Sequence, residues 1–182
     1  MKQLYTLTIA ALLAVMGLTL TACDDDDFVA YSLEGTWEGQ TAMAFTYNGY
    51  TYESTYSYIN FNRDPYRYSS GTGYWVDYFS SDAPWQYIAN HISWTVRDEV
   101  IYVYFEEDKY EIQITNYRLN DDHFMGRFYT DTGEAWNFDL VHTSSPNWGS
   151  YRYGYWDYYY APAQNGAKAP ARPQRTVVLP TK

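Results

Sequence analysis

The chain has one cysteine, Cys23, which stands directly between an apolar run and four aspartates at residues 24–27. A single cysteine cannot form a disulfide within its own chain, so the fold must be held by its core. In an exported protein an unpaired thiol calls for an explanation. The chemistry of Cys23 therefore depends on what precedes it.

The residues before Cys23 have the order of a secretory signal. Lys2 supplies the basic start, residues 8–20 are mostly apolar, and Thr21 and Ala22 are small, as a signal peptidase requires. The apolar run is short for a transmembrane helix. We expect residues 1–22 to be removed, the alternative being an uncleaved membrane anchor.

Leu-Thr-Ala-Cys at residues 20–23 resembles the lipobox of bacterial lipoproteins. The resemblance implies that Cys23 becomes the first residue of the mature chain and carries the covalent lipid that holds it to a membrane. Two or more acyl chains hold a soluble domain stably, whereas one binds reversibly. We expect no other cofactor.

The acidic tract resembles the surface-export signal of Bacteroidetes lipoproteins, in which acids follow the lipidated cysteine. The resemblance implies a lipid-anchored protein of the outer membrane, exposed on the cell surface. The alternative is that the aspartates merely begin a solvated tether, which repulsion holds off the headgroups. In either case we expect residues 23–31 to form an acidic tether ahead of the barrel domain.

Other residues that could do chemistry are scattered. His91, His123 and His142 fall on separate predicted strands without the spacing of metal ligands. The acid pairs at 106–107 and 121–122 fall at predicted turns, where solvated carboxylates are common. We therefore expect no catalytic residues, no metal site and no enzymatic activity.

The net charge of −10 excludes some partners. An acidic body repels nucleic acid and anionic headgroups. The composition is also unusually aromatic, with 23 Tyr and 7 Trp, which is typical of an exported β-protein. The sequence does not indicate an oligomeric state.

Residues 32–143 alternate between apolar and polar side chains, with turn residues at regular spacing. The pattern predicts an all-β domain without a helix. Nearly all connections look like hairpins, which favours an eight-stranded antiparallel up-and-down barrel over a β-sandwich. The expected strands are residues 32–45, 50–61, 73–80, 85–97, 100–106, 110–116, 123–130 and 135–141.

Gly35-Thr36-Trp37 resembles the Gly-x-Trp motif of lipocalins, whose tryptophan plugs the closed end of an eight-stranded barrel. Thr115-Asn116-Tyr117 resembles the family's Thr-Asp-Tyr turn, with Asn116 in place of the acid. The family's basic residue near the end of the last strand is missing, as is its C-terminal helix. The resemblance covers residues 33–142 and implies a lipocalin-like barrel.

A lipocalin-like barrel implies a binding function, for a small apolar ligand or a glycan. An eight-stranded barrel either fills with side chains or holds one small ligand. Gly35, Gly39 and Gly126 would leave room inside. The candidate ligand-binding residues are Trp37, Trp94, Trp136 and Tyr117.

A second candidate site lies on the outside of the barrel, where Tyr102, Tyr104 and Tyr129 form a predicted aromatic surface patch. Such a patch suits a glycan or a protein, although ordinary cross-strand pairing explains it equally well. The alternative function is a structural or interaction lipoprotein, with a filled barrel that contacts a partner protein or the envelope.

The composition changes after the last predicted strand. Residues 144–160 are rich in tyrosine, and we expect them either to cap a barrel mouth or to lie loosely on the surface. Residues 161–182 are Pro/Ala-rich and basic, and lack the apolar surface that would offset the entropy of ordering. We expect this tail to be disordered.

Overall fold

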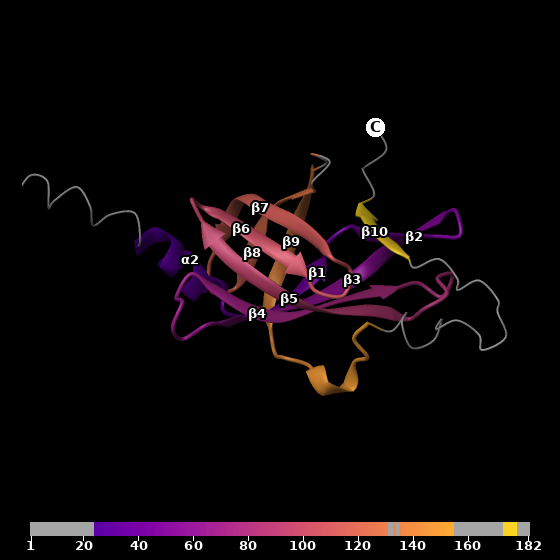
Figure 1. Ribbon diagram of the computed structural model, residues 1–182, viewed down its shortest axis with the longest axis horizontal. Coiled ribbons are helices and arrows are strands. Elements are labelled where there is room, and N and C mark those ends of the chain that lie inside the picture. Colours follow the sequence, from indigo (N-terminus) through magenta and orange to yellow (C-terminus); the bar gives the residue numbers. More distant parts are fainter. Residues whose placement is uncertain (1–23, 131–132, 134, 155–172, 178–182) are drawn as a thin grey trace, which may run out of the picture.

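The barrel closes through one six-residue strand. In the computed structural model, which describes residues 24–130, 133, 135–154 and 173–177, β1 (Gly35–Gln40) pairs with both β3 (Tyr50–Arg63) and β9 (Ala135–Thr143). The other elements are α2 (Asp24–Leu33), β2 (Met43–Tyr47), β4 (Ser70–Phe79), β5 (Tyr87–Arg97), β6 (Val100–Phe105), β7 (Tyr110–Leu119), β8 (His123–Thr130), the 3-10 helix η1 (Trp148–Ser150) and β10 (Gln174–Val177). From β3 to β9 each strand pairs with the next in the chain, so the predicted eight-stranded antiparallel barrel is confirmed (Figure 1).

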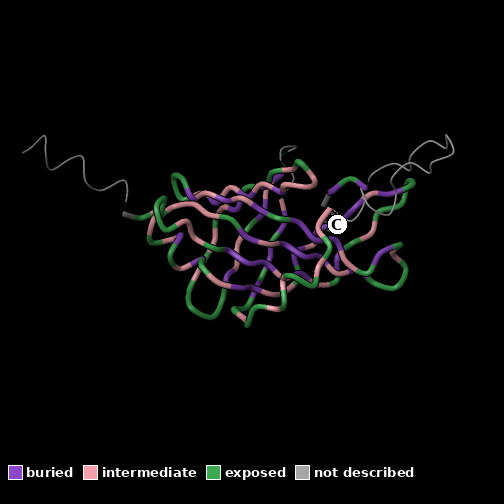
Figure 2. The backbone as a smooth tube through the Cα atoms, turned by 60° about the horizontal axis from the view of Figure 1, so that its bottom comes forward, coloured by how far each residue is buried: buried purple, intermediate pink, exposed green. Residues whose placement is uncertain are grey.

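Local sequence explains the hairpins and the inward faces. Asn48 and Gly49 both have positive φ, 51° and 82°, as a two-residue hairpin turn requires. On β5 the alternation of Ile92, Trp94 and Val96 places all three side chains in the core, as predicted. Figure 2 shows the same alternation of buried and exposed segments along the strands.

The first predicted strand, residues 32–45, is wrong as a single element. The chain turns after β1 at Ala42, whose φ is 50°, and β2 continues at a new angle. The buried Thr41 hydroxyl holds this corner against the Ser57 hydroxyl at 2.7 Å. Consequently β1 pairs with residues 57–61 of β3, and β2 pairs with residues 50–53 of the same strand.

Two irregularities re-aim side chains along the wall. One bulge lies in β3 between Ser54 and Tyr56. A second lies in β7 between Thr115 and Arg118, where Asn116 has a φ of 49°. The Thr-Asn-Tyr segment is therefore a bulge within β7 and not the turn after it.

The expectation of no helix is wrong, because α2 stands where an acidic tether was predicted. Aspartates favour a helix N-terminus, where the macrodipole is positive, and the helix then buries Ala30 and Leu33 in the barrel core. The Asp26 carboxylate accepts hydrogen bonds from the backbone N–H groups of Asp98 and Glu99, at 3.1 and 3.2 Å. The helix thus covers the end of the barrel that contains the β5–β6 turn.

The prediction of a disordered tail at 161–182 is wrong for β10. This strand pairs with β2, placing Arg175 beside Phe45, and it lies at the opposite end of the barrel from α2 (Figure 1). No helix in the described part of the chain is long and apolar enough to cross a bilayer. We call the α2 end the closed end and the β10 end the mouth.

The docking of α2 is testable through Leu33, whose side chain is fully buried. Leu33→Ala should lower the free energy of unfolding by about 2–5 kcal/mol, because it leaves a cavity in the core. Phe28→Ala, on the same helix but 70% exposed, should change it by less than about 0.5 kcal/mol. Urea titration measures both, and equal effects would mean that α2 is not packed on the barrel.

Candidate binding site

Trp37, a predicted ligand residue, closes the barrel. Its indole N–H donates to the Leu33 carbonyl at 2.9 Å, and its ring is fully buried. The ring meets Phe124 and His142 edge-on, with centroids 5.7 and 5.0 Å apart. His142 thus covers the tryptophan near the end of β9, where no Lys or Arg is present.

Trp136 and Trp94 are also buried in the wall, each 3% exposed. The Trp136 indole donates to the Thr41 carbonyl, at the corner between β1 and β2. The Trp94 indole donates to the Thr72 carbonyl at 3.0 Å. All three tryptophans therefore have their polar atoms satisfied by the protein's own backbone.

The closed half of the interior is filled by aromatic rings. Phe128 stacks on Phe138 with centroids 4.1 Å apart, and Phe124 meets Phe138 edge-on at 4.9 Å. The room expected above Gly126 is occupied, since a Cβ there would lie 2.8 Å from Tyr117 and 3.0 Å from Phe138. Gly35 and Gly39 likewise lie against His142 and Leu140.

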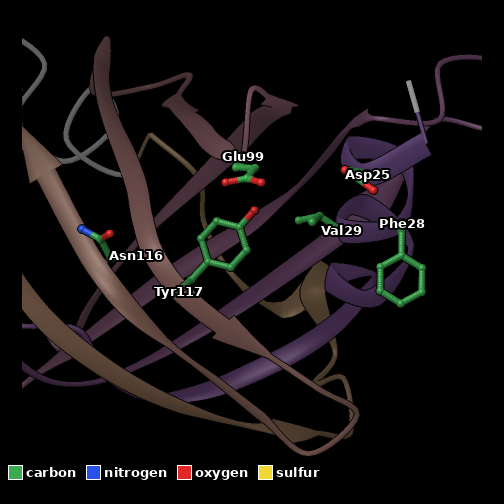
Figure 3. Close-up of a pocket in the computed structure, with 6 residues that line it drawn as sticks. All are labelled: Asp25, Phe28, Val29, Glu99, Asn116 and Tyr117. Atoms are coloured by element: carbon green, nitrogen blue, oxygen red, sulfur yellow. The ribbon is translucent and has the colours of Figure 1, made fainter. Parts of the chain in front are cut away.

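Tyr117 differs from the three tryptophans because it lines an open groove. The groove, about 390 Å³, lies between α2 and β7, and the Tyr117 phenol points from β7 toward Glu99 and the helix (Figure 3). Partial burial, with the nearby charges of Asp26 and Glu99, raises the pKa of Tyr117 to about 12. Asn116 lines the same groove.

A larger groove, about 600 Å³, lies against the β3–β4 connection at the closed end. Trp94 contributes to its lining, so two of the four predicted ligand residues line surface grooves. Arg63, Arg67 and Asp64 line it, with Arg63 paired to Glu34 at 3.4 Å, and Tyr66, 90% exposed, also contributes to the lining. Trp94 is only 3% exposed, so the ring surface that it offers in the groove is small and hydrogen-bonding side chains dominate the lining.

The most polar part of the interior lies at the mouth, around Asp77 on β4. Its carboxylate is fully buried and accepts hydrogen bonds from the Ser57 hydroxyl at 2.6 Å and the Trp75 indole N–H at 2.8 Å. Ser57 in turn meets the Thr41 hydroxyl. Buried carboxylates of this kind need a cation.

Arg175 of β10 supplies that cation. Its Nη1 donates to Asp77 and its Nε to Asp108, both at 2.8 Å, and its side chain is 1% exposed. The guanidinium carbon lies 3.8 Å from the Phe105 ring centroid and 4.5 Å from that of Phe45. Burial alone would lower the pKa of Arg175, but the two carboxylates raise it above its usual value, so the group stays charged.

The sequence reasoning missed this cluster, although half of it had a signal. Asp77 lies two residues from both Trp75 and Phe79, which are buried, so all three share one face of the strand. The period of two therefore already places the Asp77 carboxylate inside the barrel. Arg175 has no such signal, because its four-residue strand is ordered by contacts with β2 and with two distant carboxylates.

The predicted surface patch of Tyr102, Tyr104 and Tyr129 lies on the outer face of β6 and β8, where each ring is half-buried. Tyr102 and Tyr129 flank Gln113 across β7. Arginines cover two of the rings, Arg97 at 4.8 Å from the Tyr102 centroid and Arg127 at 5.9 Å from that of Tyr129. That these tyrosines bind a ligand stays a prediction.

The described part of the tyrosine-rich segment packs on the outer face of β4 and β5 and does not cap the mouth. Trp148 stacks on Tyr74 with centroids 5.1 Å apart, and Tyr153 lies 4.0 Å from His91. Tyr151 and Tyr78 share a hydrogen bond between their hydroxyls, at 2.7 Å. Residues 155–160 lie outside the described residues.

The predicted absence of a metal site concerns residues that the structure describes, whereas the predicted lipid anchor does not. Within the described ranges, no three His, Cys, Asp or Glu side chains gather closely enough to hold a metal ion. Cys23 lies outside those ranges, and its lipid stays a prediction.

The structure is a closed antiparallel eight-stranded barrel, a class whose interior is either filled by side chains or holds one small ligand. The profile of the lipocalin-like domain matches residues 33–125, and the chain belongs to that family. A search of curated proteins found no match. The lipocalin-like fold is typically a non-enzymatic binding domain.

Tyr117 gives a test of the groove beneath α2. Its pKa of about 12 exceeds the ordinary value of about 10, so between these pH values the unfolded chain releases a proton that the folded chain keeps. Stability that is present below pH 10 is therefore lost as the pH rises toward 12. Tyr117→Phe should lessen this decline in the free energy of unfolding, measured by urea titration at each pH.

The matched control is Tyr50→Phe, which removes one phenol from an exposed hairpin. If both variants decline equally, Tyr117 is not held in the environment described.

Proposed function

We propose that the chain is a lipid-anchored binding protein of the outer-membrane surface, in which Cys23 carries the lipid and the barrel binds a small apolar ligand or a glycan. The lipobox resemblance and the acidic tract support the anchor and the location. The lipocalin-like barrel supports binding in general.

One observation carries the proposal: α2 and the mouth lie at opposite ends of the barrel (Figure 1). The helix begins at Asp24, directly after the proposed lipid attachment at Cys23, and is packed on the closed end. An anchor there sets the closed end toward the membrane and directs the mouth outward, where a ligand would enter. No flexible tether is needed.

Exposed aromatic side chains at the closed end support this orientation. Phe28 and Tyr31 on α2 are 70% and 63% exposed, and Tyr66 and Tyr68 in the β3–β4 connection are 90% and 56% exposed. Tyrosine, with an apolar ring and a polar hydroxyl, favours the membrane interface, and phenylalanine is common on the apolar face of interfacial helices. The acidic charge of α2 favours neutral headgroups over anionic ones.

The filled half of the interior limits the places where a ligand could bind. Aromatic rings fill the closed half, so an interior ligand must lie toward the mouth, against Phe45, Trp75 and Phe105. A glycan would instead use the groove lined by Trp94. If neither is used, the interaction lipoprotein becomes the better description.

The anchor is tested by labelling cells with an alkyne fatty acid. The full chain should incorporate the label and Cys23→Ala should not, because the thioether is the first lipid bond formed. Protease added to intact cells should degrade the labelled protein if it is on the surface. Label on Cys23→Ala, or complete protection from protease, would contradict the anchor or the location respectively.

The orientation is tested with an unlipidated chain that begins at Asp24 and with neutral vesicles. Adding Phe28→Ser and Tyr31→Ser should weaken vesicle binding several-fold in flotation assays, because both rings would leave the interface. Tyr50→Ser, which removes a ring 68% exposed on the β2–β3 hairpin, is the matched control and should have no effect. Equal losses would contradict the orientation.

Ligand binding is tested by native mass spectrometry of the protein from its own host. A bound small molecule should add a discrete mass that is lost on denaturation. Phe105→Ser should lose an interior ligand, whereas Trp94→Ala should lose a glycan held in the groove. A chain with no added mass would contradict ligand binding and favour the interaction role.

A further inference from the structure

The mouth contains a site whose present occupant is part of the chain itself. We propose that it is a binding site for a guanidinium group carried on an extended peptide, and that β10, with Arg175, is a resident plug that such a ligand displaces. The inference rests on the proposed binding function of the barrel, and deepens it by naming a ligand class.

The chemistry of the site matches a planar, forked cation. Two carboxylates approach the group from different edges, Asp77 at Nη1 and Asp108 at Nε, while aromatic rings lie near it. A lysine ammonium offers one nitrogen and cannot reproduce this spacing. Arginine also stacks on aromatic faces and forms strong charge-assisted hydrogen bonds.

The barrel builds the site without help from β10. Ser57 on β3 and Trp75 on β4 fix the Asp77 carboxylate, Asp108 lies in the β6–β7 turn, and Phe105 ends β6. Four of these groups thus belong to strands of the wall, and Asp108 belongs to the turn that joins two of those strands. Removal of β10 would therefore leave a preorganised anionic pocket rather than a collapsed one.

A second feature selects an extended peptide over a free cation. β2 pairs with β3 along one edge and with β10 along the other, because β1 ends at Gln40 and β9 pairs with β1 and β8. A strand edge beside a side-chain pocket is the arrangement of β-strand addition, in which backbone bonds give affinity and the pocket gives specificity.

The resident strand fits the site imperfectly. Among the residues that the structure describes, β10 spans four and pairs with β2 alone. Nη2 of Arg175 is buried and finds no hydrogen-bond acceptor among the described residues. A ligand that satisfied this third donor, or that paired along more of β2, would compete with the plug.

The first experiment is chemical rescue of Arg175→Ala in the full chain. The variant should melt at a lower temperature than wild type, because Asp77 is left without its cation. Millimolar ethylguanidinium should raise its melting temperature, measured by circular dichroism, while ethylammonium should raise it much less. Arg127→Ala, which removes an exposed arginine, should show no rescue.

Equal responses of Arg175→Ala and Arg127→Ala would overturn the site. If Arg175→Ala does not fold alone, recovery of the folded spectrum only in ethylguanidinium supports the proposal. If it folds under neither condition, Arg175→Lys takes its place, and it should bind the peptide described next; failure of that binding overturns the proposal.

The second experiment uses a fluorescent peptide with the sequence of residues 173–177, followed by anisotropy. It should bind Arg175→Ala at least tenfold more tightly than wild type, where the resident strand competes. A peptide with lysine at the arginine position should bind at least tenfold more weakly, and Asp77→Asn in the Arg175→Ala chain should abolish binding. Equal binding of both peptides would overturn guanidinium selectivity.

These titrations show whether the site accepts an external guanidinium or only that of Arg175. Their outcome is independent of the proposed lipid anchor and small-ligand binding. Binding to Arg175→Ala alone identifies the plug as the sole occupant and contradicts displacement, whereas measurable displacement in wild type supports an external ligand. Fatty-acid labelling and native mass spectrometry do not involve this peptide, so either proposal can fail while the other stands.

Discussion

An ionised carboxylate inside an aromatic barrel is the constraint on which the structure of the mouth depends. Taking such a charge out of water costs several kcal/mol unless a cation and hydrogen-bond donors replace the solvent. Asp77 has both, from Ser57, Trp75 and Arg175. Because the cation comes from the far end of the chain, burial of one side chain on β4 orders a strand almost a hundred residues away.

The fold was largely predictable because most of its determinants are local. Alternation placed Ile92, Trp94 and Val96 inside, and Asn48-Gly49 set a hairpin turn. The helix α2 was missed because its aspartates resemble a solvated tract until Ala30 and Leu33 find the barrel core. β10 was missed for a stronger reason: its composition is that of a disordered tail, and long-range contacts with β2, Asp77 and Asp108 oppose that tendency.

The candidate site was less predictable than the fold. Period two identifies which rings face inward, but a ring that fills a core and a ring that lines a cavity have the same pattern. The difference depends on volume supplied by other strands. Gly126 illustrates this, since the space its missing side chain leaves is taken by Tyr117 from β7 and Phe138 from β9. Trp37, Trp94 and Trp136 are inward as expected, yet their indoles are bonded to the protein's own carbonyls.

Different interactions close the two ends of the barrel. They determine whether the closing element, α2 or β10, can leave and which ligand could take its place. Apolar packing and the Asp26 hydrogen bonds hold α2, and detaching the helix would expose Leu33 and Trp37 with nothing gained in return. At the mouth, exchange of one guanidinium for another preserves both ion pairs, so the large desolvation terms cancel between the two bound states. A neutral ligand that displaced Arg175 would leave Asp77 buried and unpaired. The mouth therefore discriminates by charge first, and an apolar ligand can enter only beside the plug or with a cation of its own.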